Sequence, residues 1–439
     1  MTTLTQSNEA AERAVIERDG KRYLRTETDD LLEIKYGLPG EVAFCRRCVI
    51  SNQRPSSAVE FAHTKDSKKS TIHFDEDGIC DACRYAEQKD RGVDWEERRA
   101  QLVELCDRFR SHNGSYDCLV PGSGGKDSIY AAMVLKREYG MHPLTVTWAP
   151  HLYTDVGWHN HQAWVHEGGF DNYLFTPDGQ LHRKLTQLAY RNLLHPFQPF
   201  IFGQKNYAPK MAQRMGIPLV FYGENEAEYG NPSKDNSEAK RSLSYFARQS
   251  SANETLYFGG VPMEELPAHG IETGQMDPYL PGNTDELIAA NIEVHYLGYY
   301  IKWVPQECYY YSSEHVGFLA AEDRTEGTYS KYNSIDDKTD PYHYWTTLMK
   351  FGIGRTTYDA SQEIRNDHIT REEGVALVDR YDQEFPSKHF PEFLKYLDME
   401  EGEFFEIADS FRSPHLWEPS ADGWTLRHRV ENHAETSSA

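Results

Sequence analysis

Long apolar runs are missing from this sequence. None approaches the length needed to span a bilayer, so no membrane segment is predicted. The first twenty residues, MTTLTQSNEAAERAVIERDG, hold neither the basic stretch nor the apolar stretch of a secretion signal. The expected location is therefore the cytoplasm.

Positive charge is also scarce. Lys and Arg number 46 against 69 Asp and Glu, which gives a net charge of −23. Proteins that bind nucleic acid through its phosphates usually present a basic face, so the charge favours a small-molecule substrate or a protein partner. A hydrophobic fraction of 39% over 439 residues is that of a soluble globular chain with more than one core.

Cysteines are few, seven in all, and their odd number without a secretion signal argues against a disulfide framework. Four of them form two C-x-x-C pairs, whose spacing is typical of a tetrahedral zinc site. We expect a structural Zn²⁺ to hold residues 41–92, a module too short and too polar to fold around a core alone. An iron–sulfur cluster is the alternative. The paired cysteines are Cys45, Cys48, Cys80 and Cys83. The others are expected to be small buried residues: Cys106, Cys118 and Cys308.

Apolar stretches alternate with helical patterns between residues 117 and 222. DCLVP, PLTVTW, NYLFT and IPLVFYG are expected to be strands, and the segments between them helices. This alternation predicts an α/β domain over 93–230, built on a doubly wound parallel sheet.

The flanking segments are less regular. Residues 1–40 are expected to be an extension with a short helix over NEAAERAVIER and a hairpin around RDGKRYLR. Residues 231–418 are predicted to form a mixed, largely helical region that binds substrate. Residues 419–439 are expected to be a polar, frayed tail.

A glycine-rich turn follows the first predicted strand, in LVPGSGGKDS. It is not a Walker A loop, because Asp127 stands where that motif has Ser or Thr, and it lacks the third glycine of a dinucleotide fingerprint. Its glycines nevertheless let backbone N–H groups approach an anion, and Lys126 adds positive charge where a helix begins. The turn therefore predicts a phosphate site. The alternative is an ordinary strand-to-helix turn capped by Asp127.

The run SGGKDS after an apolar strand resembles the S-G-G-x-D-S fingerprint of the PP-loop ATP pyrophosphatases, which include GMP synthetase, asparagine synthetase and tRNA thiolation enzymes. Members cleave ATP between the α- and β-phosphates and adenylate a carbonyl oxygen before a nucleophile displaces AMP. The resemblance implies that ATP and Mg²⁺ bind here, with the adenosine near Thr147 and Trp148. It assigns the pyrophosphate and its magnesium to Ser123, Gly124, Gly125, Lys126, Asp127 and Ser128.

Acidic residues follow the fourth predicted strand, in YGENEAEYG. Open α/β sheets bind ligands at the carboxyl ends of their strands, so Glu224, Asn225 and Glu226 are expected to lie near the phosphate loop. Lys126 and Asp127 are candidate catalytic residues, and Glu224 and Glu226 are candidates for a general base. A surface acidic turn is the alternative.

Further motifs extend from residue 41 to about 400. They are the paired cysteines, VPGSGGKDS, HPFQPFIFGQK, YGENEAEYG and LMKFGIGRTTYDASQEIR. In this order they resemble the N-acetyl sugar amidotransferase family of the PP-loop superfamily, which acts in bacterial surface-polysaccharide biosynthesis such as that of lipopolysaccharide. Its members convert the acetamido group of an N-acetyl sugar into an acetamidino group. Ammonia comes from a separate glutaminase subunit, and none of the three unpaired cysteines here resembles a glutaminase nucleophile.

Two features of the C-terminal region are candidates for substrate binding. Arg355 and Asp359 lie in KFGIGRTTYDASQEIR, and a guanidinium suits a phosphate or a sugar carboxylate. The segment GTYSKYNSIDDKTDPYHYW could stack on a base or a sugar. An ion pair and a packed interdomain surface are the respective alternatives.

Two other functions stay open. Sulfur transfer to tRNA often pairs a PP-loop with C-x-x-C zinc modules, but it needs a reactive cysteine, for which Cys308 is the candidate. A nucleotide-sensing or scaffold subunit without activity is opposed by the intact run from Ser123 to Ser128.

Overall fold

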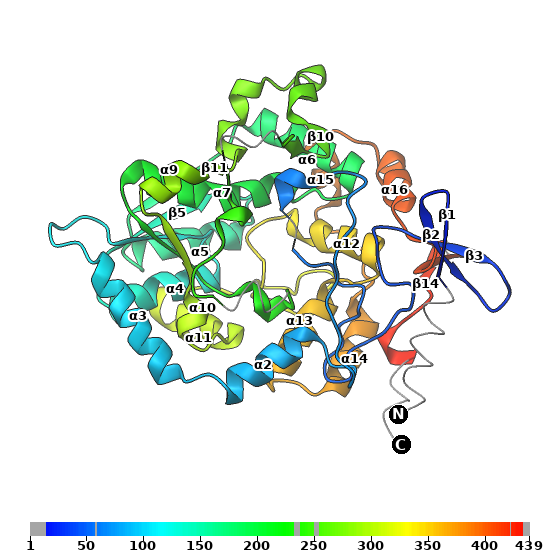
Figure 1. The fold of residues 1–439 in the computed structure, drawn as a ribbon, viewed down its shortest axis with the longest axis horizontal. Coiled ribbons are helices and arrows are strands. Elements are labelled where there is room, and N and C mark those ends of the chain that lie inside the picture. The colour runs from blue at the N-terminus through cyan, green and yellow to red at the C-terminus, as the bar shows by residue number, and fades with distance from the viewer. Residues whose placement is uncertain (1–14, 58, 232–237, 250–253, 422, 433–439) are drawn as a thin grey trace.

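A computed structural model describes residues 15–57, 59–231, 238–249, 254–421 and 423–432 (Figure 1). Its centre is a five-stranded sheet of order β12-β7-β4-β5-β6. Every neighbouring pair in this sheet is parallel. The strands are β4 (Cys118–Pro121), β5 (Pro143–Trp148), β6 (Asn172–Phe175), β7 (Leu219–Tyr222) and β12 (Glu293–Tyr296). The predicted parallel sheet is therefore confirmed.

Helices cover both faces of the sheet, and the strand residues alternate between them. Leu119 and Val220 pack with residues of α7 (Gln198–Met215) in one hydrophobic core. Val120 and Phe221 pack with residues of α4 (Lys126–Arg137) in the other. Successive strand side chains point to opposite faces, so strands that are apolar throughout are buried on both sides.

The sheet extends beyond the predicted end of the α/β domain at residue 230. Its fifth strand, β12, pairs in register with β7, Val294 lying opposite Val220. The strand has only four residues, EVHY, and the apolar–polar alternation in IEVHY is too short to predict it from the sequence alone.

The remaining helices follow the predicted order closely. Asp94, Thr154 and Asp178 accept hydrogen bonds from backbone N–H groups at the starts of three of them, which satisfies donors that lack intrahelical partners. These are α3 (Trp95–Phe109), α5 (Asp155–His166) and α6 (Gly179–Leu193). Shorter helices are α2 (Asp81–Arg91), α9 (Thr284–Ala289), α10 (Leu297–Tyr300) and α11 (Pro305–Val316). Two-residue strands are β8 (Ala247–Arg248), β9 (Tyr257–Phe258), β10 (Val261–Pro262) and β11 (Gly282–Asn283).

The C-terminal region is helical, as predicted. Its helices are α12 (Asp340–Phe351), α13 (Arg355–Arg365), α14 (Arg371–Tyr381), α15 (Phe390–Leu397) and α16 (Glu401–Ser410). The expected frayed tail is wrong for its first part, because β13 (Trp417–Ser420) and β14 (Gly423–Leu426) form a hairpin. Leu426 and Val430 are buried, so apolar side chains spaced among polar ones anchor this segment.

The described part of the N-terminal extension, from residue 15 onward, is also part of the folded body. The strands β1 (Val15–Arg18), β2 (Lys21–Arg25) and β3 (Leu31–Ile34) form an antiparallel sheet, which confirms the predicted hairpin. The helix expected over NEAAERAVIER is wrong at Val15–Arg18, and its other residues lie outside the described ranges. Figure 1 shows this sheet beside β14 and α16, and His415 N donates to Glu33 O at 3.3 Å. None of the helices in the described ranges is long and apolar enough to cross a bilayer.

Candidate nucleotide site and four-cysteine centre

A cavity of about 490 Å³ opens at the carboxyl edge of the sheet. The chain proceeds from β4 to β5 and β6 on one side and to β7 and β12 on the other, so the strand order reverses between β4 and β7. Open α/β sheets bind ligands at such a reversal, because the loops leaving the two strands diverge there. Ser123 and Glu224, from the loops after β4 and β7, both line this cavity.

The loop after β4 can exist only with glycine at one position. Gly124 has φ +89°, and a Cβ placed on it would lie 2.5 Å from Cα of His161. Gly125 is the N-cap of α4, and no side chain caps the helix. Asp127 is therefore not the cap, and the alternative of an Asp127-capped turn is wrong. The first N–H groups of α4 remain available for an anion.

Lys126 and Asp127 form an ion pair at the start of α4, with Nζ 2.5 Å from Oδ2. Burial lowers the pKa of Lys126, but the carboxylates of Asp127 and Glu224 outweigh it, so the pKa is raised and the lysine stays charged. Asp127 lines the main cavity, whereas Lys126 lines a smaller neighbouring one. Oδ1 of Asp127 is buried without a hydrogen-bond partner among the described residues, which suits a metal ligand.

Ser123, Gly125 and Ser128 line the main cavity, and Gly124 lines the smaller one beside Lys126. The residues of the predicted phosphate loop therefore line two cavities, the main one and the smaller one.

Trp148 and Thr147 have different positions. Trp148 lines the cavity at the end of β5, beside Phe197 and Tyr207. A Cβ on Gly203 would lie 1.9 Å from the indole Cδ2, so only glycine admits the ring there. Its buried Nε1 has no hydrogen-bond partner among the described residues. This apolar half of the cavity fits a planar base.

Thr147 does not line the cavity. It is fully buried, and its hydroxyl accepts a hydrogen bond from Asn172 Nδ2 at 3.1 Å. Because neighbouring strand residues point to opposite faces, Thr147 and Trp148 cannot both face α7.

The two candidate bases differ in their surroundings. Burial is the main cause that raises the pKa of Glu224 to about 8, and the Asp127 carboxylate adds to it. Tyr229 donates a short hydrogen bond to Glu224 Oε1. Glu226 instead pairs with Arg241 at 2.5 Å and accepts a hydrogen bond from Tyr296 OH at 3.1 Å. Burial acts to raise the pKa of Glu226, but the positive charge of Arg241, together with weaker contributions from other groups, lowers it below the usual value.

Asn225 serves the fold of this loop. Its side chain accepts a hydrogen bond from Ala227 N at 2.9 Å and so caps the 3₁₀ turn η2 (Glu226–Tyr229). Only 1% of Asn225 is exposed, and it does not line the cavity.

One wall of the cavity comes from residues that the sequence did not single out, together with Tyr344 of the segment expected to stack on a base or a sugar. They are Arg241, Asp336, Asp337, Asp340, His343 and Tyr344. Ser123 of the phosphate loop hydrogen-bonds to Asp336, whose pKa burial raises. Five of the six lie in NSIDDKTDPYHYW, which the sequence singles out only for its tyrosines. The nearby aspartates were the signal that could have identified this wall.

Arg355 and Asp359 lie behind this wall rather than on it. Arg355 is 2% exposed, and its Nη1 is 3.1 Å from Asp340 Oδ2. Its Nε is 3.7 Å from Asp359 Oδ2. Burial raises the pKa of Asp340 to about 8 although Arg355 opposes the shift. Arg355 therefore forms a buried ion pair, which was the alternative to substrate binding. This ion pair holds Asp340, which lines the cavity.

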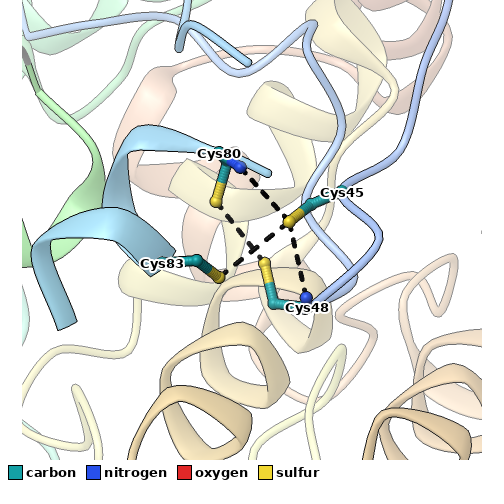
Figure 2. A group of neighbouring side chains, drawn as sticks. All are labelled: Cys45, Cys48, Cys80 and Cys83. Atoms are coloured by element: carbon teal, nitrogen blue, oxygen red, sulfur yellow. Dashed lines mark hydrogen bonds between the residues drawn. The ribbon is translucent and has the colours of Figure 1, made fainter. Parts of the chain in front are cut away.

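The two cysteine pairs meet in a buried cluster. Figure 2 shows all four sulfur atoms pointing toward a common centre, two from a loop and two from the start of α2. The four Sγ atoms lie within 4.8 Å of one another. Cys45 Sγ also accepts hydrogen bonds from Cys48 N at 3.5 Å and Cys80 N at 3.4 Å. Four convergent thiols with backbone N–H donors fit a structural zinc ion, with no open position for catalysis.

The cysteine cluster is packed against the C-terminal helices. Val49 and Ile72 share its core with Ile353, Ala360 and Ile364. In Figure 1, α2 lies beside α13 and α14. The carbonyl oxygens of Cys45 and Cys48 accept hydrogen bonds from Arg371 at the start of α14. The module predicted over residues 41–92 therefore shares its core with residues far away in the sequence.

Comparison with known proteins gives two similarities. Residues 326–431 match the family model described as LPS biosynthesis protein WbpG-like, C-terminal domain. A stretch of 88 residues is 30% identical to the uncharacterized protein MJ1599 of Methanocaldococcus jannaschii, covering 19% of this chain and 29% of that protein. The chain thus spans under a third of the length of that curated relative. The similarity of the C-terminal region supports a role in polysaccharide biosynthesis.

Proposed function

We propose that the protein is an ATP-dependent amidotransferase, which replaces the acetamido oxygen of an N-acetyl sugar with nitrogen from ammonia. The observation that carries this is that the glycine-rich loop after β4, at the uncapped start of α4, and the buried carboxyl of Glu224 after β7 line one cavity. The WbpG-like match, which contributes cavity-lining Asp336 and Asp340, supports a sugar of a surface polysaccharide as the substrate.

The chemistry requires activation of a poor electrophile. Attack of the amide oxygen on the α-phosphate of ATP would form an O–P bond and release pyrophosphate. The uncapped start of α4, with Lys126, would neutralise the phosphate charge that develops. Mg²⁺ would be held by Asp127, whose Oδ1 has no protein partner among the described residues, and would supply further neutralisation.

Ammonia would then attack the activated carbon. A C–N bond forms, the C–O bond to AMP breaks, and one N–H proton must leave so that an amidinium product results. Glu224 lines the cavity and would take this proton in its ionised form, which is a stronger base than an ordinary carboxylate because burial raises its pKa to about 8. Glu226 is a weaker candidate, because its carboxylate is engaged by Arg241, Tyr296 and Asn231.

Ammonia would be supplied by a separate glutaminase subunit. The three cysteines outside the cluster are all buried, which supports a source of ammonia outside this chain. The proposed partners are accordingly this subunit and the N-acetyl sugar or its nucleotide derivative.

Sulfur transfer to tRNA is less well supported. Cys308 lies on α11 and is 1% exposed. Burial raises its pKa well above the usual value, so the thiolate that sulfur chemistry needs is disfavoured.

Mass spectrometry of sugar products tests the proposal. The protein is incubated with Mg-ATP, ammonium and a panel of acetamido sugars and their nucleotide derivatives. We expect a product in which NH replaces oxygen, formed together with AMP. Lys126→Ala should lower its yield about a hundredfold, whereas exposed Lys388→Ala should not. Absence of the product across the panel, or full activity of Lys126→Ala, would contradict the proposal.

A further inference from the structure

A buried ion pair joins the four-cysteine module to the loop that carries the candidate base. Lys89 Nζ lies 2.9 Å and 3.0 Å from the two carboxylate oxygens of Glu228. The two side chains are 3% and 5% exposed. Lys89 Nζ also donates to the carbonyl oxygen of Trp303 at 3.1 Å. Both charged groups are therefore shielded from water, and each is stabilised by the opposite charge of the other.

Lys89 and Glu228 belong to two different parts of the molecule, the four-cysteine module and the loop after β7. Lys89 lies on α2, the helix for which Cys80 is the N-cap and which holds Cys83 in its first turn. Glu228 lies in η2, four residues after Glu224. Neither Lys89 nor Glu228 lines the cavity, whereas Glu224 does.

Other contacts hold the same loop from the side of the cysteine module. Arg365, on α13 beside the cysteine cluster, donates to Glu228 O at 2.9 Å. Gly230 has φ +83°, and a Cβ there would lie 2.3 Å from Ile72 Cδ1. Only glycine allows the chain to approach Ile72 so closely. The loop is thus fixed at the end away from the cavity.

We propose that Lys89 and Glu228 are positioning residues, which transmit the fold of the four-cysteine module to Glu224 at the cavity. The identity of the reaction that they serve rests on the proposed function. The pair supplies what packing alone does not: directional bonds to both carboxylate oxygens of Glu228 hold η2 in place, and so limit where Glu224, four residues earlier, lies relative to the phosphate loop.

Hydrogen–deuterium exchange and kinetics of four variants of the full chain test this. In Lys89→Met, amides of residues 223–231 should exchange about tenfold faster or more. The kcat for the acetamido sugar should fall about tenfold or more, while KM for ATP changes less than about threefold. Lys89→Arg should recover much of both.

Lys302→Met is the matched control. Lys302 pairs with Asp90 Oδ1 at 2.8 Å, so it joins α2 to the neighbour of Trp303, but its side chain is 47% exposed. It should leave both exchange and kcat unchanged. If Lys89→Met behaves like Lys302→Met in both readouts, the pair has no positioning role.

A double variant separates positioning from stability. Lys89→Met with Glu228→Met removes both charges, and apolar replacement of a buried pair is often tolerated by the fold. We expect it to regain a melting temperature near that of the wild type without regaining kcat. Recovery of kcat would overturn the inference. If the wild type makes no amidine but Lys89→Met still frees residues 223–231, the proposed function fails and the positioning stands.

Discussion

Gly124 lies directly against the backbone of His161: a Cβ on Gly124 would be 2.5 Å from Cα and 2.7 Å from N of His161. The predicted phosphate loop after β4 therefore packs directly against α5, and this packing requires a residue without a Cβ at position 124. His161 is 3% exposed and cannot move aside, because backbone atoms make the contact.

Gly124→Ala should therefore weaken nucleotide binding strongly. The φ of +89° disfavours alanine, and the clash would push the loop away from the start of α4. A misplacement of this kind costs about a hundredfold in ATP affinity or turnover. Isothermal titration with ATP measures it. Gly402→Ala, whose Cβ would meet no atom within 4 Å, is the control. Wild-type affinity in Gly124→Ala would show that the loop does not hold the nucleotide.

The two glutamates after β7 should respond differently to neutralisation. Glu224→Gln keeps the size of the side chain but cannot take a proton, so kcat should fall by about a hundredfold or more with the melting temperature nearly unchanged. Steady-state kinetics beside thermal denaturation measures both effects. A Glu224→Gln variant with normal kcat would remove Glu224 as the base.

Glu226→Gln should act mainly on stability. It would leave the buried guanidinium of Arg241 without its counter-charge, which costs about 3 kcal/mol of unfolding free energy. Denaturant unfolding measures the loss. If stability is unchanged and only kcat falls, the roles assigned to the two glutamates are reversed.

Loss of one cluster cysteine should remove a metal ion. Cys45→Ala leaves three thiols, so we expect metal content to fall from one zinc ion per chain to nearly none, with loss of stability in α13 and α14, which share its core. Elemental analysis by mass spectrometry measures the metal. Cys106→Ala, at a buried cysteine outside the cluster, should keep the zinc. Iron with visible thiolate-to-metal absorption would establish a cluster of iron and sulfur instead.

Stability should fall in mild acid. Burial lowers the pKa of His415 to about 4, whereas an unfolded histidine titrates near 6.5. Between these values the unfolded chain binds the extra proton, so stability is complete above pH 6.5 and is lost as the pH falls toward 4.

His415→Gln should remove up to about 3 kcal/mol of this pH dependence. Denaturant unfolding at several pH values measures it, with exposed His269→Gln as control. An unchanged slope between pH 6.5 and 4 in His415→Gln would contradict the origin assigned here.

The sequence predicts those features that local patterns determine. The strand before SGGKDS and the cysteine pair Cys45 and Cys48 could be predicted, because a few adjacent residues define each feature. Thr147, expected near the adenosine, does not line the cavity, because alternation along β5 sends it to the face opposite Trp148. This alternation can be read from the sequence itself.

Other features of the site depend on contacts between residues far apart in the sequence, so no local pattern predicts them. Arg241 reaches the cavity only because its segment runs beside β12, where its N donates to Val294 O. Asp340 lines the same cavity as Ser123 although the two residues lie far apart in the sequence. The Lys89–Glu228 pair spans 139 residues. Glu228 belongs to YGENEAEYG, but nothing in that motif indicates its distant partner.

Transfer of oxygen from the acetamido group to AMP tests the central claim most directly. An acetamido sugar labelled with ¹⁸O in its carbonyl is incubated with the protein, Mg-ATP and ammonium, and the AMP is analysed by mass spectrometry. The account predicts that each AMP formed with an amidine carries one labelled oxygen. Unlabelled AMP, or label recovered only in the sugar, would contradict activation of the amide oxygen by ATP.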